Sequence, residues 1–412
     1  MKNNPKIYLV GGAVRDKALG LIVVDKDWVV VGSSPAEMVD QGFVPVGKDF
    51  PVFIKKDSGE EYALARTERK TAKGYQGFQF NASPDITLEQ DLERRDLTIN
   101  AMAEDSDGNL IDPHNGMQDL QDKVLRHVSD AFIEDPVRIL RVARFAARFN
   151  FSIAPETLSL MKKMVTSGEV DALVAERVWA EMRKALITET PQVFFQVLRD
   201  CGALAKILPE IDNLYGVPQT AKYHPEIDTG VHTLMVVEQA AKLTDDPKVR
   251  FAALVHDLGK ALTPKDELPS HKKHEFRGLP LIKELCERLR VPKSYQALSL
   301  AASEYHQLMH KMYELRPETV LKMLEKTRSI NDDERAKQIA LCCRADARGR
   351  TTFEDTPYPQ SDLFLEYQQV AKNVDSKSIA ATLSNGPDIQ AAIRKARIEK
   401  ISQYKKRVKP NV

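Results

Sequence analysis

The feature that most constrains this chain is a pair of glycines followed, after a short spacer, by two aspartates. A short apolar run leads into Gly11 and Gly12, and a short helix is predicted directly after them. Glycines allow the backbone to approach a ligand closely, and N–H groups at a helix start favour phosphate. Asp25 and Asp27 lie at the start of a second predicted strand, where alternation would point both carboxylates to one face. Such a pair repels itself unless a cation lies between the carboxylates, and its oxygens suit Mg²⁺. The pattern therefore predicts a phosphate cradle beside a magnesium site.

Each half of this pattern has an ordinary explanation when it occurs alone. Paired glycines are usual in turns, and an Asp-x-Asp sequence is usual at strand ends and in solvated loops. Only their order and spacing together indicate metal-assisted nucleotide chemistry.

Length and composition narrow the class of protein. A chain of 412 residues suggests two to four domains, and a net charge of +1 means that any contact with nucleic acid must come from local patches. One such patch begins at Ala392, after which basic residues far outnumber acidic ones; a solvated tail is the alternative. No stretch approaches the ~20 apolar residues of a membrane span, so we expect no membrane association. Four cysteines without a Cys-x-x-Cys pair indicate reduced thiols and a cytoplasmic location.

The hydropathy pattern predicts an α+β protein with two unlike parts. The first 80 or so residues carry short strand patterns at 6–10, 28–31, 43–46, 52–55 and 61–65, with helices at 14–19 and 35–40. From Thr87 onward we expect helices throughout, including 88–97, 135–149, 155–167, 191–201, 231–243 and 249–258. Between the two parts, the basic, glycine-punctuated segment 66–77 is predicted to be a loop near the active site or a plain surface loop.

The predicted helix 135–149 carries an arginine face. At about 100° per residue, four arginines share one arc of about 120°, with the apolar residues largely opposite: Arg138, Arg141, Arg144 and Arg148. Asp135 lies beside Arg138 at the helix start, where a carboxylate is favoured. A solvated arginine face is the common explanation, but guanidinium groups are also suited to bidentate recognition.

An aspartate beside an arginine can distinguish nucleobases. Cytosine and adenine each present an amine donor next to a ring-nitrogen acceptor, whereas guanine and uracil present the reverse. A carboxylate and a guanidinium match the first pattern and mismatch the second. Asp135 and Arg138 are therefore predicted to accept C and A, with protein side chains in the place of a template.

Together these motifs resemble the bacterial class II tRNA CCA-adding enzymes, a family with a polymerase-β-like nucleotidyltransferase head. The resemblance rests on residues 11–16, the Asp-x-Asp pair, Arg94-Arg95-Asp96-Leu97-Thr98-Ile99-Asn100-Ala101 and the arginine helix, and Lys26 is a small departure from the family pattern. It implies that Asp25 and Asp27 hold Mg²⁺ and act in catalysis. It also implies that Asp135 and Arg138 read the base and that the remaining nucleotide contacts come from Gly12, Arg15, Arg95, Arg141 and Arg144.

A second motif lies far along the chain, where the predicted helix 249–258 ends in His256-Asp257-Leu258-Gly259-Lys260. With His232 upstream and Asp346 downstream, this looks like an HD metal-dependent phosphohydrolase domain. Imidazole and carboxylate ligands suit Ni²⁺ or another transition metal, which would present hydroxide to a phosphoester. The part that His274 and His306 take in the ligand set stays open. The alternative is a degenerate HD helix kept for packing.

These observations predict a nucleotidyltransferase head with a small mixed sheet, a long all-helical neck and body, and an HD domain. The expected boundaries are 1–130 for the head, 131–215 for the neck and body, 216–350 for the HD domain and 351–412 for a basic helical tail. The resemblance implies template-independent addition of CCA to tRNA from CTP and ATP, with phosphatase, 2′-nucleotidase and 2′,3′-cyclic phosphodiesterase activities from the HD domain, in a monomer or homodimer. A poly(A) polymerase and an RNA-binding protein with lapsed chemistry are the alternatives.

Overall fold

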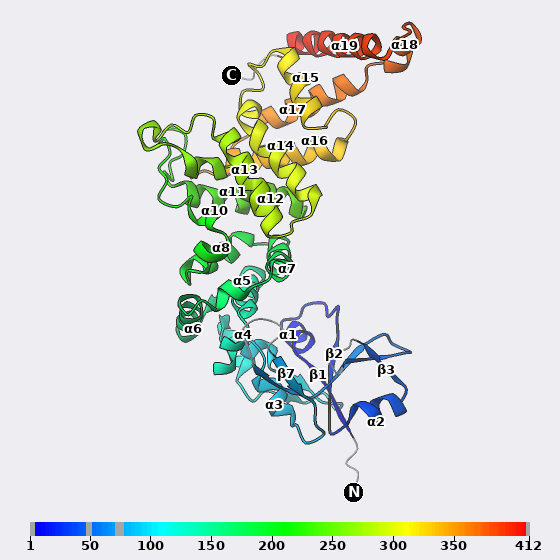
Figure 1. Cartoon of the computed structure of the whole chain (residues 1–412), viewed down its shortest axis with the longest axis vertical. Coiled ribbons are helices and arrows are strands. Elements are labelled where there is room, and N and C mark those ends of the chain that lie inside the picture. The colour runs from blue at the N-terminus through cyan, green and yellow to red at the C-terminus, as the bar shows by residue number, and fades with distance from the viewer. Residues whose placement is uncertain (1–4, 47–51, 71–77, 409–412) are drawn as a thin grey trace. The chain divides into compact units, whose positions relative to one another are not determined.

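The computed structural model describes residues 5–46, 52–70 and 78–408, and it divides into two compact units. The first unit comprises Met1–Glu181 with Gln196–Ile207, and the second comprises Met182–Phe195 with Leu208–Val412. Among the described residues, all β-strands lie in the first unit, and the second is helical (Figure 1). The predicted α+β class, with a small sheet followed by a long helical part, is therefore confirmed.

A seven-stranded sheet in the order β3-β4-β5-β2-β1-β8-β9 forms the centre of the head. Its strands are β1 (Lys6–Val10), β2 (Asp27–Val31), β3 (Phe43–Val46), β4 (Val52–Lys55), β5 (Glu61–Leu64), β8 (Ala103–Glu104) and β9 (Leu110–Ile111). The sheet is mixed, because β2 runs antiparallel to β1 and parallel to β5. Val10, the residue before Gly11, pairs with Asp27. This register brings the end of β1 and the start of β2 together.

Both faces of the sheet are covered, because neighbouring residues of a strand point to opposite sides. Val29 packs in a cluster with Leu88 and Leu92 of α3 (Leu88–Glu93). Val30 packs on the other face in a cluster with Met38 of α2 (Pro35–Asp40). The purely apolar run of β2 after Asp27 follows from this two-sided burial.

Three local predictions need correction. The segment 66–77, expected to be a loop, contains the strand β6 (Thr67–Lys70), which pairs with β7 (Phe78–Asn81) directly after the segment, while residues 71–77 lie outside the described residues. The helix expected over 88–97 ends at Glu93. Short strands also occur beyond residue 87, namely β8, β9, β10 (Val124–Leu125) and β11 (Ser152–Ile153). Each of these has two residues, too few to show an alternating pattern.

A series of helices follows the sheet along the chain. They are α4 (Gly116–Asp122), α5 (Val137–Phe149), α6 (Pro155–Thr166), α7 (Ala175–Leu186), α8 (Pro191–Asp200), α9 (Ala203–Ile207) and α10 (Pro209–Asp212). The apolar face of α5 is buried at Ile139, Val142 and Ala146. Its arginine face is therefore the face that remains for polar contacts.

The second unit is a helical domain in which small residues line the contact between two of the helices. Its helices are α11 (Thr229–Leu243), α12 (Pro247–Val255), α13 (His274–Arg288), α14 (Lys293–His310), α15 (Pro317–Lys326), α16 (Asp333–Arg348), α17 (Pro359–Lys372), α18 (Ser376–Ala381) and α19 (Gly386–Arg407). Ala252 and Ala253 of α12 are buried in one cluster with Ala301 and Ala302 of α14. Small side chains allow two helices to approach closely.

A close backbone contact joins the short 3₁₀ helix η5 (Leu258–Leu262) to α13. A Cβ atom at Gly259 would lie 2.0 Å from the His274 carbonyl oxygen and 2.5 Å from Gly278 N. Only glycine fits at residue 259, so the segment after Asp257 lies directly on the start of α13.

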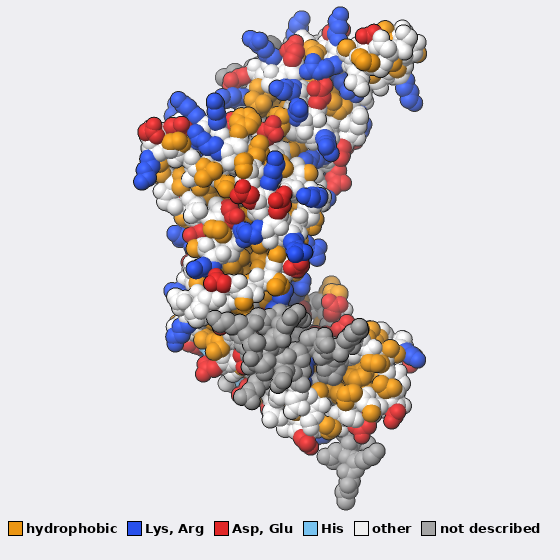
Figure 2. Space-filling view, in the orientation of Figure 1, with side chains coloured by type: hydrophobic (Ala, Val, Ile, Leu, Met, Phe, Trp, Pro, Cys, Tyr) orange, Lys and Arg blue, Asp and Glu red, His pale blue; other side chains and the backbone are white. Residues whose placement is uncertain are grey.

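The basic C-terminal segment forms α19, which packs on α15 and α17 through the buried Ile401. Figure 2 shows Lys and Arg side chains over this end of the chain. Two of its basic side chains donate to backbone carbonyls, Arg397 to Ala371 and Lys405 to Leu315, and Arg394 pairs with Glu325. Part of this charge therefore fixes the helix to its own domain.

All four cysteines are buried and free. Within the described ranges, none of the helices has the length and apolarity needed to cross a membrane.

Candidate active sites

The glycine turn of the head is shaped by an arginine. Gly11 has φ +67°, in the left-handed region, and a Cβ there would lie 2.7 Å from Arg95 Nη1. Gly12 opens α1 (Gly12–Ala18), as the predicted phosphate cradle requires. The turn thus needs glycine both for its conformation and for the approach of Arg95. Arg95 also donates to Asp91 Oδ2 at 3.1 Å, and its buried Nε has no hydrogen-bond partner in the described part of the chain.

A polar network joins this turn to α5. Arg15 is almost fully buried, and its Nη1 donates to Asn100 Oδ1 at 2.5 Å. Asn100 Nδ2 donates to Asp96 Oδ1 at 3.0 Å, and Arg141 Nε donates to the other oxygen of Asp96 at 2.7 Å. Burial would raise the pKa of Asp96, but Arg141 and Asn100 outweigh it and lower this pKa well below its usual value. The structure therefore brings together four of the predicted nucleotide-binding residues, Gly12, Arg15, Arg95 and Arg141.

The start of α5 differs from the prediction in one respect. Asp135 lies before the helix, and its carboxylate accepts two hydrogen bonds from Arg177 of α7, at 2.6 and 3.0 Å. Arg138 is mostly buried and donates to the carbonyl oxygens of Ala131 and Arg94. The partner of Asp135 was therefore missed in the sequence, and the base-reading role of Asp135 and Arg138 stays a prediction.

Arg144 joins α5 to α7. Its Nε donates to Glu181 Oε2 at 2.5 Å, and its guanidinium lies 4.1 Å from the centre of the Phe145 ring. Arg177 and Glu181 are one helical turn apart, so α7 makes one ion pair with α5 and a neighbouring one, of opposite polarity, with Asp135 in the segment before α5. This contact holds the arginine face of α5 in place.

The two aspartates of the Asp-x-Asp motif are exposed. β2 begins at Asp27, and Asp25 lies in the segment before it, so strand alternation gives no reason for the two to share a face. Their oxygen donors still fit Mg²⁺, which prefers carboxylates and retained waters at accessible sites.

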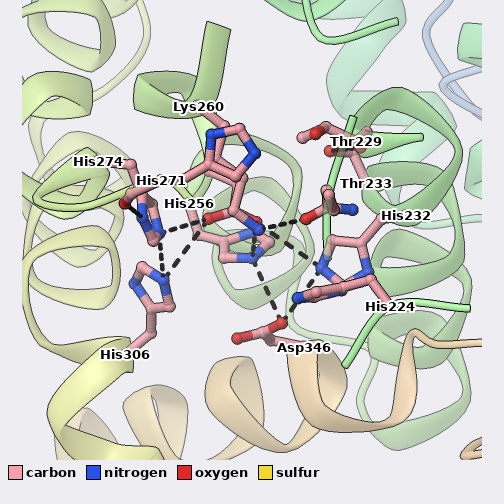
Figure 3. A network of polar contacts seen from close by, with 12 residues as sticks. His224, Thr229, His232, Thr233, His256, Lys260, His271, His274, His306 and Asp346 are labelled. Atoms are coloured by element: carbon pink, nitrogen blue, oxygen red, sulfur yellow. Dashed lines mark hydrogen bonds and ion pairs between the residues drawn. The ribbon is translucent and has the colours of Figure 1, made fainter. Parts of the chain in front are cut away.

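The second site is a cluster of buried histidines and aspartates in the HD region (Figure 3). In four of its histidines Nδ1 lies 2.6–2.8 Å from a backbone carbonyl oxygen. A carbonyl can only accept, so Nδ1 carries the proton and Nε2 presents a lone pair. These four are His232, His256, His274 and His306. Fixing the tautomer in this way is typical of metal-ligating histidines.

The first group of ligands contains His232, His256 and Asp346. Asp346 Oδ1 lies 3.3 Å from His232 Nε2 and 3.6 Å from His256 Nε2. Both Nε2 atoms are buried and have no hydrogen-bond partner among the residues that the structure describes. Asp257 Oδ2 adds a fourth donor atom, 3.2 Å from His256 Nε2 and 3.7 Å from His232 Nε2. The four residues predicted from the sequence therefore meet at one point.

A second group forms on the other oxygen of Asp257. Its Oδ1 lies 3.1 Å from His274 Nε2 and 3.5 Å from His306 Nε2, and these two nitrogens are 3.0 Å apart. Both nitrogens present lone pairs, which repel each other unless a cation lies between them. The donor set therefore fits two cations with Asp257 between them, and both histidines left open by the sequence belong to it.

The electrostatics of the cluster favour positive charge. Burial lowers the pKa of His256, but Asp257 and Asp346 outweigh it and raise this pKa to about 10. Burial also raises the pKa of Asp257, yet His256 and Lys260 hold it well below its usual value. The carboxylates thus draw a positive charge to Nε2 of His256, where a metal ion would replace the proton.

Two supporting residues were missed in the sequence. Glu226 Oε1 lies 3.0 Å from His224 Nδ1 and 3.1 Å from His232 Nδ1. A carboxylate behind a ligating histidine orients its ring and makes it a stronger ligand. The only sequence signal is a second histidine and an acidic residue shortly before His232.

Three family models match successive parts of the chain. Residues 7–126 match the poly A polymerase head domain, residues 150–215 match the probable RNA and SrmB-binding site of polymerase A, and residues 229–348 match the HD domain.

Curated relatives match over almost the whole length. The multifunctional CCA protein of Nitrosococcus oceani is 56% identical over 398 residues, which is 97% of this chain and 98% of that protein. The multifunctional CCA protein of Shewanella frigidimarina is 56% identical over 403 residues, 97% of each chain. This chain belongs to the multifunctional CCA protein family.

Solved structures share the fold of this chain. A CCA-adding enzyme in its apo form II has a TM-score of 0.66 at 21% identity, over 97% of this chain and 91% of that one. The Bacillus stearothermophilus CCA-adding enzyme in complex with CTP has a TM-score of 0.64 at 20% identity, over 97% and 90%.

Proposed function

We propose that this chain adds and repairs the 3′-terminal CCA of tRNA from CTP and ATP, with release of pyrophosphate, and that its HD domain hydrolyses phosphoesters. Membership of the multifunctional CCA family supports the first proposed activity. The two groups of candidate histidine and aspartate ligands that share Asp257 support the second proposed activity, phosphoester hydrolysis. The four-part division at residues 130, 215 and 350 stays a proposal.

In the head, the nucleotide would lie between the glycine turn and the arginine face of α5. The N–H groups at the start of α1, with Arg15 and Arg95, would bind its phosphates. Arg141 and Arg144 would complete the nucleotide contacts, and Asp135 and Arg138 would read the base. Asp25 and Asp27 would hold Mg²⁺. When bound, this ion would activate the tRNA 3′-hydroxyl and neutralise charge on the departing pyrophosphate.

Arg177 supports the assignment of Asp135. A carboxylate held by two hydrogen bonds from one guanidinium cannot rotate freely. Its remaining lone pairs therefore keep one direction, as discrimination between an amine donor and a carbonyl acceptor requires.

Sequencing of product ends tests the first activity. The full chain is given tRNA that lacks its 3′ end, with labelled CTP and ATP, and the termini are sequenced. We expect two C residues followed by one A. A run of A would favour a poly(A) polymerase, a product ending in CC would mean that a partner adds the A, and no product would favour a binding protein with lapsed chemistry.

In the HD domain, His232, His256, Asp257 and Asp346 would hold one ion, and Asp257, His274 and His306 a second. Mixed nitrogen and oxygen donors suit Ni²⁺, Co²⁺ or Mn²⁺. Such ions supply hydroxide at neutral pH. The residues themselves orient the ligands and exclude water from the buried side.

Hydrolysis of a 2′,3′-cyclic nucleotide with added Ni²⁺, Co²⁺, Mn²⁺ or Mg²⁺ tests the second activity. The double variant with His256→Gln and Asp257→Asn should lose hydrolysis and keep CCA addition. His114→Gln, a histidine substitution in the first unit, is the matched control. Wild-type protein that hydrolyses neither a cyclic phosphate nor a phosphomonoester with any of these ions would favour a structural HD helix.

A further inference from the structure

Two buried donor atoms beside the HD ligand cluster have no hydrogen-bond acceptor within the described part of the chain, and neither belongs to a metal ligand. The first is the side-chain amide of Gln219. Its Oε1 accepts from Lys260 Nζ at 2.6 Å, and the same ammonium group lies 2.5 Å from Asp257 Oδ2. Because lysine only donates, the amide oxygen must face it, and the orientation of Nε2 is fixed. Gln219 is 3% exposed, and its Nε2 has no hydrogen-bond partner in the described ranges.

The second donor is the guanidinium of Arg350, just beyond the end of α16. Its Nη2 lies 3.9 Å from Asp346 Oδ1, which is too long for a hydrogen bond. Its Nε is buried and unpartnered as far as the chain is described. The guanidinium lies within ion-pair range of Asp346 and, among the described residues, retains an N–H without a partner, which can donate to a further anion beside the ligand cluster.

The main chain at or next to each donor residue contacts the segment before α11 or α11 itself. Gln219 N donates to the Ile227 carbonyl oxygen at 2.6 Å, and Thr351 N donates to Glu226 Oε2 at 3.4 Å. His232 Nδ1 donates to the Gly349 carbonyl oxygen at 2.8 Å. Ile227 itself has φ +61°, a costly conformation for a β-branched residue, so its neighbours hold it in place. The two donors therefore lie on backbone that is fixed relative to the ligands.

We propose that Arg350 and the Gln219 amide form an anion-binding subsite that holds the non-bridging oxygens of the substrate phosphate beside the metal cluster. The proposal rests on the hydrolase function proposed above and adds the residues that select phosphate. A phosphate offers only acceptors, which matches a guanidinium and an amide N–H. Because these donors contact oxygens that phosphomonoesters and cyclic phosphates share, the subsite accepts both. It makes no contact that distinguishes the group to which the phosphate is esterified.

Phosphate binding to metal-loaded full-length protein tests the subsite. Inorganic phosphate is titrated calorimetrically, and the metal content of each sample is measured in parallel. Arg350→Ala should weaken phosphate binding roughly tenfold or more, because a charge-assisted hydrogen bond is lost. Arg350→Lys should fall between this variant and wild type. Gln219→Glu, which replaces a donor by a carboxylate, should also weaken binding. Arg348→Ala is the matched control, since Arg348 Nε donates to the Thr356 carbonyl oxygen.

The possible results distinguish a failure of the proposed phosphate subsite from a failure of the proposed hydrolase function. Unchanged phosphate affinity in Arg350→Ala and Gln219→Glu, at full metal content, overturns the subsite, as does wild-type protein that binds metal and no phosphate. Loss of metal from Arg350→Ala would also overturn it, because the residue would then support the ligands. If wild type hydrolyses no phosphoester but binds phosphate in an Arg350-dependent way, the subsite stands and the hydrolase proposal fails.

Discussion

His310 holds one oxygen of Asp346 while the other oxygen faces the ligand histidines. His310 Nε2 lies 2.8 Å from Asp346 Oδ2, whereas Oδ1 lies 3.3 Å from His232 Nε2. On its far side, His310 Nδ1 accepts from the Tyr358 hydroxyl at 2.8 Å. A chain of hydrogen bonds thus fixes the rotation of the carboxylate before any ion is bound.

We expect His310→Gln to lower the affinity for one metal ion by roughly 10–100-fold, because Asp346 would be free to rotate. Competition with a chromophoric chelator measures this affinity. Tyr358→Phe removes only the outer hydrogen bond and should have a smaller effect. Equal affinity in wild type and His310→Gln would mean that Asp346 needs no support.

The two ligand groups predict a stoichiometry. His274→Gln or His306→Gln should bind one ion less than wild type, because each removes a donor from the second group alone. His232→Gln should lose the other ion, and Asp257→Asn should weaken both, since its two oxygens face both groups. Metal analysis after dialysis gives the counts. A single ion in wild type, retained by His274→Gln, would contradict the two-ion arrangement.

Replacing either aspartate of the head motif should abolish nucleotide addition. Asp25→Ala or Asp27→Ala would remove oxygen donors for Mg²⁺ and leave the surfaces that bind tRNA unchanged. Addition of labelled CTP is measured beside tRNA binding in a filter assay. Asp40→Ala, an exposed aspartate at the end of α2, is the control. Near wild-type turnover in either variant would show that the ion is held elsewhere.

Base selectivity should depend on Asp135 and on its partner. Asp135→Ala or Arg138→Ala should reduce the use of CTP and ATP and raise the relative incorporation of UTP or GTP, since a lost hydrogen bond costs roughly 1–3 kcal/mol. Arg177→Met should do the same more weakly, because Asp135 would remain but lose its orientation. Incorporation from equimolar mixtures of the four nucleotides measures the effect. If Asp135→Ala and Arg138→Ala both keep wild-type ratios, Arg141 or Arg144 would have to read the base.

The stability of the head should depend on pH through Asp96. Arg141 and Asn100 hold the pKa of Asp96 below its unfolded value, against the effect of burial. As the pH falls, the unfolded chain is therefore protonated first. The stabilisation is complete above the unfolded pKa of about 4 and is lost as the pH falls below it toward the folded pKa.

Asp96→Asn should accordingly lower the melting temperature at pH 7 and differ less from wild type as the pH falls from 5 to 3. Both tryptophans, Trp28 and Trp179, lie in the first unit, so their fluorescence reports its unfolding. Asp107→Asn, at an exposed position, controls for the loss of one charge. A constant difference across this pH range would be evidence against the ionised Asp96 as the stabilising form.

The features that the sequence predicted well are local ones. The strand at 6–10 and the helix at 35–40 were predicted at their observed bounds. A short apolar run marks the first and a capping box between Ser34 and Glu37 opens the second, and both signals lie in neighbouring residues. The ion pair of Asp135 with Arg177 joins residues 42 positions apart, and His274 meets His306 across 32 positions. Nothing in the local pattern specifies such pairs, since they arise from how helices pack.

The glycine contact between η5 and α13 fixes the distance between the main-chain segment that carries Asp257 and the one that carries His274. Asp257 lies two residues before Gly259, and His274 contributes the carbonyl that a Cβ at Gly259 would strike. The span from the central carboxylate to the second pair of histidines is therefore set by backbone touching backbone. A closer approach of the two segments would require a residue smaller than glycine, so a smaller ion at the second position can be reached only by movement of the ligand side chains.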